Sequence, residues 1–233
     1  MVDLNNSSIA LAIFDVAGTT AQDGGLVVEA FQSAMESMGV ARGSADMDRM
    51  TDYVNATMGE RKIDVFLHLC DGDRSRANIA HDRFVESYIA LVKAGRLEEF
   101  SGISEFFHDL RDKGIAVAIT TGFPRDILDN IIDGLKWAPL IDFSVAASEV
   151  AQGRPAPDMI FRCIELYNKK FGTHIAGDDI AVIGDTESDI RSGITAGAKL
   201  VVGVASGAHN PEQLFHVGAT HVLNFATELP SII

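Results

Sequence analysis

The chain has 233 residues, 47% of them hydrophobic and 22% charged, so it can bury the core of one substantial α/β domain, alone or with a smaller inserted domain. Its 33 acidic residues outnumber 19 basic ones, which gives a formal net charge of -14. This balance repels nucleic acid and anionic membrane surfaces, and no apolar run approaches membrane-spanning length. We therefore expect no nucleic-acid or membrane partner, and an anionic substrate would need local positive charge or a metal ion.

Two features of the sequence predict a cytoplasmic protein. The N-terminal segment MVDLNNSSIALAIF has no basic region before its short apolar run and no small-residue cleavage site, so it does not predict a signal peptide. Cys70 and Cys163 stand in separate apolar patterns, without the spacing of a pair or of metal ligands. We expect both cysteines to be reduced core residues.

The first predicted element is a buried parallel strand at residues 9–14, because its apolar run shows no alternation. Asp15 ends this run and is followed by VAGTT. An acid at this place lies at the carboxyl edge of a sheet, where open α/β proteins bind their ligands. Asp15 is therefore a candidate nucleophile, and the competing interpretation is that it only caps a turn.

A long helical region follows the glycine-bearing loop at residues 16–25. Apolar residues recur at helical spacing from Leu26 until Gly39, and glycine-containing turns separate the later helical patterns. The predicted helices are 26–39, 47–58, 60–69 and 75–91. We interpret residues 26–98 as an all-helical cap domain that closes over the Asp15 edge of the sheet.

From Gly102 onward, predicted helices and strands alternate. The helices are expected at 102–113, 156–171, 187–196 and 211–217, and the strands at 115–120, 141–146, 180–183, 200–204 and, at an edge, 220–223. This alternation predicts an α/β fold with a parallel sheet and helices on both faces. The catalytic core then comprises residues 1–25 and 99–233, with the cap inserted after the first strand.

A second acidic strand end completes a candidate metal site. Asp185 follows the apolar run IAVI in the sequence GDTESDI, so it leaves the sheet as Asp15 does. Neighbouring carboxylates repel each other, and Mg²⁺ relieves this because it accepts carboxylates, waters and a phosphate oxygen. Asp189, one helical turn further, is placed to hold a metal-bound water. The competing interpretation is that Asp185, Thr186 and Asp189 only cap the next helix.

Two more strand ends carry candidate phosphate-binding groups. Thr121 and Gly122 offer a hydroxyl and a backbone N–H at the start of a helix, and an ordinary N-cap explains them equally well. Arg154 stands between Gly153 and Pro155, so we expect a rigid loop and an aimed guanidinium. A solvated surface position is the commoner outcome for a single arginine.

Together these motifs resemble a known family. A nucleophile in DxxGTT, then a threonine, a basic residue and GDxxxD, each after a strand, resembles the haloacid dehalogenase-like superfamily of phosphotransferases. The resemblance implies a Rossmann-like core, an inserted helical cap, Mg²⁺ and an aspartyl-phosphate intermediate. The implied catalytic residues are Asp15, Lys62, Thr121 and Arg154, the substrate-binding residues Gly18, Thr19, Gly59 and Gly122, and the metal-binding residues Asp15, Ala17, Asp185 and Asp189.

Ala17 indicates a branch of this superfamily. Most of its phosphatases have a general acid–base aspartate two residues after the nucleophile, and this chain has Ala17. The sequences DVAGTT, TTGF and GRPAPD resemble the phosphonatase branch, which lacks that aspartate and uses a cap lysine that forms a Schiff base with the substrate aldehyde. Lys62 in MGERKID matches that lysine, whereas Val16, Val65 and Phe123 replace side chains typical of the branch.

The role of Lys62 has a simpler alternative, because most lysines are solvated. An amine is a nucleophile only when burial or a nearby cation lowers its pKa, and Arg61 or Arg154 is a candidate for that cation. The resemblance is also compatible with a homodimer formed through the cap helices. The apolar face at Val27, Val28, Phe31 and Met35 would serve either that dimer or the cap core.

Three functions are consistent with these residues. The first is a magnesium-dependent phosphonatase-like hydrolase that cleaves a small phosphonate through Asp15 and Lys62. The second is a phosphatase for a small phosphorylated metabolite, a phosphate monoester, in which water or a cap residue replaces the missing acid. The third is a catalytically silent sensor of a phosphorylated ligand, which the intact set Asp15, Thr121, Arg154 and Asp185 disfavours.

Overall fold

The centre of the structure, a computed structural model that describes residues 9–233, is a six-stranded sheet. The strands are β1 (Leu11–Phe14), β4 (Ala116–Thr121), β5 (Phe143–Ala146), β6 (Ile180–Gly184), β7 (Leu200–Val204) and β8 (His221–Leu223). Their order is β5-β4-β1-β6-β7-β8, and every neighbouring pair is parallel. The predicted α/β, Rossmann-like fold is confirmed. Part of the N-terminal segment considered for a signal peptide, and of the predicted core, lies outside the described residues.

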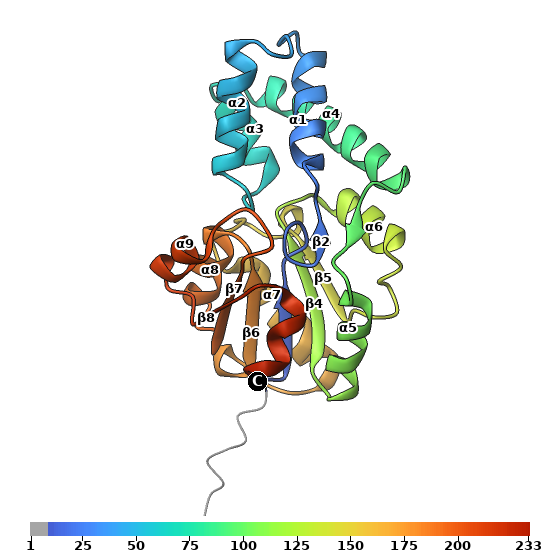
Figure 1. Cartoon of the computed structure of the whole chain (residues 1–233), viewed down its shortest axis with the longest axis vertical. Coiled ribbons are helices and arrows are strands. Elements are labelled where there is room, and N and C mark those ends of the chain that lie inside the picture. Colours follow the sequence, from blue (N-terminus) through green and yellow to red (C-terminus); the bar gives the residue numbers. More distant parts are fainter. Residues whose placement is uncertain (1–8) are drawn as a thin grey trace, which may run out of the picture.

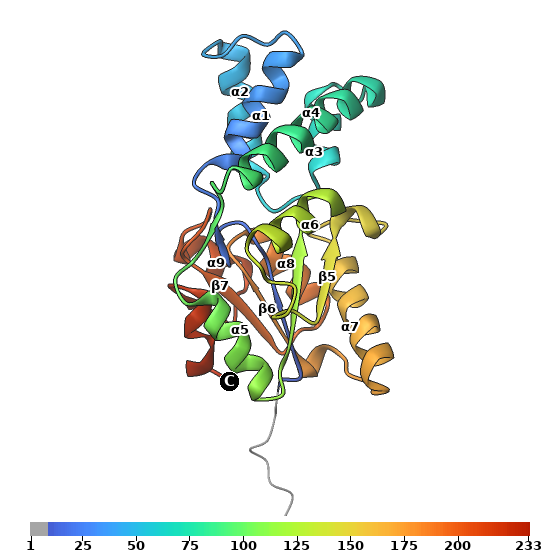
Figure 2. The same cartoon turned by 90° about the vertical axis from the view of Figure 1, so that its right-hand side faces the viewer.

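Helices cover both faces of this sheet. They are α5 (Ile103–Asp112), α6 (Arg125–Gly134), α7 (Asp158–Phe171), α8 (Glu187–Thr195) and α9 (Pro211–Val217). Alternate β1 side chains point to opposite faces: Phe14 packs against Phe106 and Phe107 of α5, whereas Leu11 and Ile13 join a cluster with α7. Figure 2 shows α5 and α7 on opposite sides of the sheet. Burial on both faces explains the unbroken apolar run of β1.

Four helices form a separate layer beyond the carboxyl ends of the strands (Figure 1). These are α1 (Leu26–Ser37), α2 (Ala45–Ala56), α3 (Lys62–Leu69) and α4 (Arg74–Lys93), and we call them the helical insertion. Aromatic contacts join α1, α3 and α4, as Phe66 packs against both Phe31 and Phe84. Val27, Phe31 and Met35 are buried, so this part of the α1 face serves the core. The domain limits at 26–98 remain a prediction.

A two-stranded antiparallel ribbon links the helical insertion to the sheet. Its strands are β2 (Ala21–Gln22) and β3 (Glu98–Glu99), which pair with each other. The carboxylate of Glu99 accepts hydrogen bonds from Trp137 Nε1 at 2.7 Å and Ser104 Oγ at 2.6 Å, which fixes the ribbon to the core. The sequence did not predict these strands, because two residues carry no measurable periodicity.

Two further expectations concern the cysteines and the membrane. Cys70 and Cys163 are both free and buried, as predicted. Within residues 9–233, no helix combines the length and the apolar character needed to cross a membrane.

Candidate active site

Three carboxylates gather at the carboxyl edge of the sheet. Asp15 and Asp185 follow β1 and β6, which are neighbouring strands, and Asp189 lies in the first turn of α8. One oxygen from each of the three lies within 4.8 Å of the others, and all three residues are buried. The order of the strands therefore brings Asp15 and Asp185 together, although these two acids are 170 residues apart in the sequence.

Asp185 is enclosed by groups from two loops. Thr19 Oγ1 donates to Oδ1 at 3.0 Å, and the N–H of Ala208 donates to Oδ2 at 2.7 Å. A Cβ atom on Gly18 or Gly207 would lie 2.5 Å or 1.9 Å from the same Oδ2, so only glycine allows this approach. Burial, followed by the charge of Asp15, raises the pKa of Asp185 to about 7.

The residues present fit a divalent cation. Burial and the neighbouring charge of Asp15, in that order, raise the pKa of Asp185, and a cation would relieve both effects. The three carboxylates offer oxygen atoms, the ligands that hard cations such as Mg²⁺ favour. Asp189 has other partners: its Oδ2 accepts from Thr186 Oγ1 at 2.5 Å and its Oδ1 pairs with Arg154. Asp15 and Asp185 would hold the ion directly, and Asp189 through a water. The proposed contribution of Ala17 stays a prediction.

We predict that Mg²⁺ raises the melting temperature of the protein and that Asp185→Asn removes the increase. A ligand at 100 times its Kd stabilises the native state by about 2.7 kcal/mol, which is roughly 5–10 °C for a chain of this size. Differential scanning fluorimetry with and without Mg²⁺ measures this without any substrate. Asp178→Asn, at an exposed position, is the matched control. An equal increase in wild type and Asp185→Asn would contradict the metal assignment.

Arg154 is a buried side chain that joins two of the acids. Its Nη2 lies 2.7 Å from Asp15 Oδ1, and its Nη1 forms an ion pair with Asp189 Oδ1. Only 5% of its surface is exposed, so the surface-arginine interpretation is wrong. The guanidinium therefore places a buried positive charge against both Asp15 and Asp189.

Thr121 and Gly122 end β4 where the helical insertion reaches the sheet. The N–H of Lys62 donates to the carbonyl of Gly122 at 3.2 Å, and a Cβ on Gly122 would lie 2.4 Å from the Glu60 carbonyl oxygen. The predicted helix 60–69 begins only at Lys62, because the backbone of its N-cap, Arg61, is extended. The N-cap of α6 is Pro124, so the N-cap interpretation of Thr121 is wrong.

Lys62 is buried at the same junction, with 5% of its surface exposed. Its Nζ donates to the Glu60 carbonyl at 3.3 Å and lies 5.7 Å from the ring centre of Phe123. Burial, followed by the positive charge of Arg154, lowers the pKa of Lys62 to about 8, against the opposing effect of nearby carboxylates. The solvated-lysine interpretation is therefore wrong, and one of the two cations suggested by the sequence contributes.

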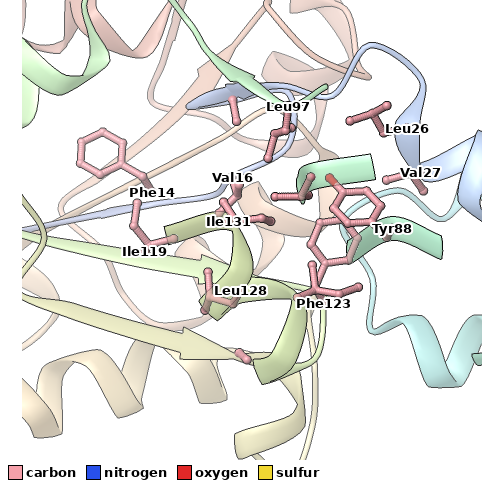
Figure 3. Packing of buried hydrophobic residues seen from close by; sticks show 14 of the residues in the cluster. Phe14, Val16, Leu26, Val27, Tyr88, Leu97, Ile119, Phe123, Leu128 and Ile131 are labelled. Carbon is pink, nitrogen blue, oxygen red and sulfur yellow. The ribbon is translucent and has the colours of Figure 1, made fainter. Parts of the chain in front are cut away.

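Phe123, which follows β4 of the core, packs against the helical insertion beside Lys62. Its ring centre lies 4.6 Å from that of Tyr88 in α4, and Figure 3 shows the two rings side by side. Both side chains are buried. Phe123, which replaces a side chain typical of the phosphonatase branch, thus makes an aromatic contact between the core and the insertion.

A cavity of about 570 Å³ joins these groups. Its lining combines the sheet edge, represented by Asp15 and Asp185, with Lys62 from the helical insertion. The predicted substrate-binding glycines all line it: Gly18, Gly59 and Gly122. Thr19 does not, because its hydroxyl is directed to Asp185. The cavity has room for a small phosphorylated molecule beside both Asp15 and Lys62.

Sequence reasoning missed two parts of this lining. Residues 206–208 follow β7, and the small residues SGA after a predicted strand were the available signal. Asp23, in the loop before α1, also lines the cavity. A single acid in a glycine-bearing loop carries no signal of its own, because such residues are common in turns.

Comparison with known proteins agrees with this geometry. The family model described as haloacid dehalogenase-like hydrolase matches residues 12–203. The chain belongs to this family. It is therefore a haloacid dehalogenase-like hydrolase, and the nucleophile that the family resemblance implied, Asp15, lies within the matched residues.

Curated relatives of this haloacid dehalogenase-like hydrolase include phosphonoacetaldehyde hydrolase from Paraburkholderia phytofirmans, which is 31% identical over 84% of this chain and 75% of its own length. A bifunctional phosphonoacetaldehyde hydrolase/aminoethylphosphonate transaminase from Clostridioides difficile is 28% identical over 84% of this chain. The chain spans only 32% of that bifunctional protein. A hydrolase structure from Pseudomonas syringae has a TM-score of 0.79 and 21% identity, covering 95% of this chain and 96% of its own, which shows the shared fold.

Proposed function

We propose that the protein is a magnesium-dependent, phosphonatase-like hydrolase that cleaves the phosphorus–carbon bond of a small phosphonate aldehyde. The observation that carries this proposal is the position of Lys62, a buried amine that lines the same cavity as Asp15. Its lowered pKa of about 8 leaves roughly a tenth of the amine neutral at pH 7. A neutral amine and a carboxylate are the two nucleophiles that such a substrate requires.

Lys62 prepares the carbon side of the bond. Its neutral amine adds to the aldehyde carbon, and loss of water leaves a protonated imine. A carbon next to a protonated imine accepts an electron pair far better than one next to a carbonyl group. The carbon is thereby made into a leaving group for the next step.

Asp15 attacks the phosphorus side. Its carboxylate, held by Arg154 at 2.7 Å, forms a bond to phosphorus while the electron pair of the phosphorus–carbon bond passes to the imine, leaving an enamine. The enamine takes a proton at its carbon, and water hydrolyses the resulting imine to release acetaldehyde and the Lys62 amine. A second water hydrolyses the aspartyl phosphate, which releases phosphate and frees Asp15. When bound, Mg²⁺ supplies positive charge that stabilises the phosphoryl oxygens, and Asp15 and Asp185 would hold it.

Ala17 supports this chemistry over ordinary ester hydrolysis. Its methyl group lines the cavity where a general acid would protonate an ester oxygen. A carbon leaving group stabilised by Lys62 needs no such acid at the moment of bond cleavage. The relative from P. phytofirmans, whose name states this aldehyde substrate, gives further support.

A phosphatase for a small phosphate monoester is the second candidate. The side chains Val65 and Phe123, both buried and apolar, favour it because they replace side chains typical of the phosphonatase branch. Without an acid at Ala17, such an enzyme would prefer esters whose leaving group needs little protonation.

We expect the protein with Mg²⁺ to release phosphate and acetaldehyde together from phosphonoacetaldehyde, faster than it releases phosphate from any ester. A coupled assay for each product, run over a panel that includes phosphoglycolate and 4-nitrophenyl phosphate, measures both. Turnover of esters without turnover of the phosphonate would overturn the proposal in favour of the phosphatase.

A further inference from the structure

Asp23 lines the cavity, but neither the imine formation at Lys62 nor the attack by Asp15 uses it. It lies in the loop between β2 and α1, where its Oδ2 accepts the N–H groups of Gly25 at 3.1 Å and Val27 at 3.3 Å. Its Oδ1 accepts the hydroxyl of Tyr88 from α4 at 3.3 Å. Contacts from two segments of the helical insertion therefore fix its orientation.

Tyr88 ties this acid to Lys62. Its side chain is wholly buried, and its ring packs on Phe123 with centres 4.6 Å apart. The same Phe123 ring lies under the Lys62 amine, 5.7 Å from Nζ. Asp23 and Lys62 thus line one cavity, and the packed pair of Tyr88 and Phe123 links them, since Tyr88 contacts Asp23 and Phe123 contacts Lys62. The hydrogen bonds of the two side chains go to other partners.

We propose that Asp23, held by Tyr88, is the group that transfers protons while Lys62 forms its imine. The proposal rests on the imine chemistry proposed above for Lys62. It assigns a task to a carboxyl group and an amine that line one cavity although they are far apart in the sequence.

Asp23 gives and takes protons in turn during this step. The Lys62 amine forms a bond to the aldehyde carbon, and the carbonyl electron pair moves to oxygen. The Asp23 carboxylate removes a proton from the nitrogen and gives it to that oxygen, which becomes a hydroxyl group. Asp23 then takes a proton from the solvent and passes it to the hydroxyl group, which leaves as water while the nitrogen electron pair forms the imine. The imine carries the positive charge of that proton, and Asp23 ends as the carboxylate it was at the start.

The surroundings of Asp23 favour this exchange. Burial raises the pKa of Asp23 above its ordinary value, while the hydrogen bonds from Val27, Tyr88 and Gly25 and the charge of Lys62 act in the opposite direction. A carboxyl group whose pKa is moved toward neutrality both gives and accepts protons more readily.

The test is the rate at which Lys62 becomes covalently trapped. Phosphonoacetaldehyde and Mg²⁺ are mixed with the enzyme, borohydride is added after timed intervals, and mass spectrometry counts the adduct. We expect Asp23→Asn to slow adduct formation by roughly 10²–10⁴-fold, the range for loss of a general acid–base group. Tyr88→Phe, which keeps the ring on Phe123, should slow it less.

Chemical rescue separates proton transfer from a structural role. In Asp23→Ala, added formate should restore part of the trapping rate, which a loss of packing alone would not allow. Asp48→Asn, at an exposed position of α2, should trap at the wild-type rate, and circular dichroism checks the fold of each variant.

The outcomes distinguish the two proposals. If wild type forms no adduct, both the imine chemistry and the role of Asp23 are overturned. If wild type forms an adduct on Lys62 and Asp23→Asn forms it equally fast, only the role of Asp23 is overturned. Slow trapping in Asp23→Ala that formate leaves unchanged would also overturn it.

Discussion

Asp15→Asn is expected to abolish turnover and the phosphorylated enzyme while the protein remains folded. The amide has nearly the same shape as the carboxylate but cannot attack phosphorus, so we expect a loss of at least ~10³-fold in kcat, the scale on which enzymes lose a principal catalytic group. Asp15 also raises the pKa of Asp185, after burial. The substitution should therefore bring the pKa of Asp185 closer to its ordinary value.

Rapid quenching with labelled substrate, followed by denaturation in acid, measures the aspartyl phosphate. The matched control is Asp178→Asn, an exposed acid outside the cavity, which should retain both the phosphoenzyme and the turnover rate. An Asp15→Asn variant that turns over at more than a tenth of the wild-type rate would show that another group attacks phosphorus. Thermal melts of the two variants confirm that folding is comparable.

Lys62→Ala is expected to lose both the borohydride-trapped adduct and turnover of phosphonoacetaldehyde, again by at least ~10³-fold, because no other nitrogen nucleophile replaces it. Lys62→Arg is the informative companion, since it keeps the positive charge but cannot form an imine. If either variant cleaves the phosphonate at the wild-type rate, the imine chemistry is wrong. A phosphatase would lose much less activity in Lys62→Arg than in Lys62→Ala.

The pH dependence of trapping follows from the lowered pKa of Lys62, about 8. Only the neutral amine reacts, so the trapping rate should rise about tenfold for each pH unit below that pKa and level off above it. A solvated lysine would continue to gain reactivity up to a pH of about 10.4. A profile that still rises steeply at pH 9 would contradict the buried environment of Lys62.

Much of the fold is predictable from the sequence because parallel strands that are buried on both faces consist almost entirely of apolar residues. The run at 9–14 and the strand 180–183 have no polar position, since both faces of β1 and β6 are covered. The acids that follow these runs could be identified for the same reason. Their proximity depends on strand order, which no local pattern encodes, and the pairing of β1 with β6 brings the two acids together.

The rest of the site depends on tertiary packing that local pattern does not encode. Asp23 and Tyr88 are 65 residues apart and meet only because α4 packs against α1. From the sequence, Phe123 differs from the phosphonatase branch only in lacking a polar group. The structure shows that its ring packs on the ring of Tyr88. Packing of this kind leaves no periodic signal.

The pairing of β2 with β3 bears on how such enzymes diversify. The chain enters the helical insertion after Gln22 and leaves it at Glu98, and these two residues are direct partners in the ribbon. Both chain connections of the insertion therefore lie at one place, where a segment whose ends meet can be exchanged without altering the strand order. On the function proposed above, exchange of the insertion would remove Lys62 and leave Asp15 and Asp185 where they are.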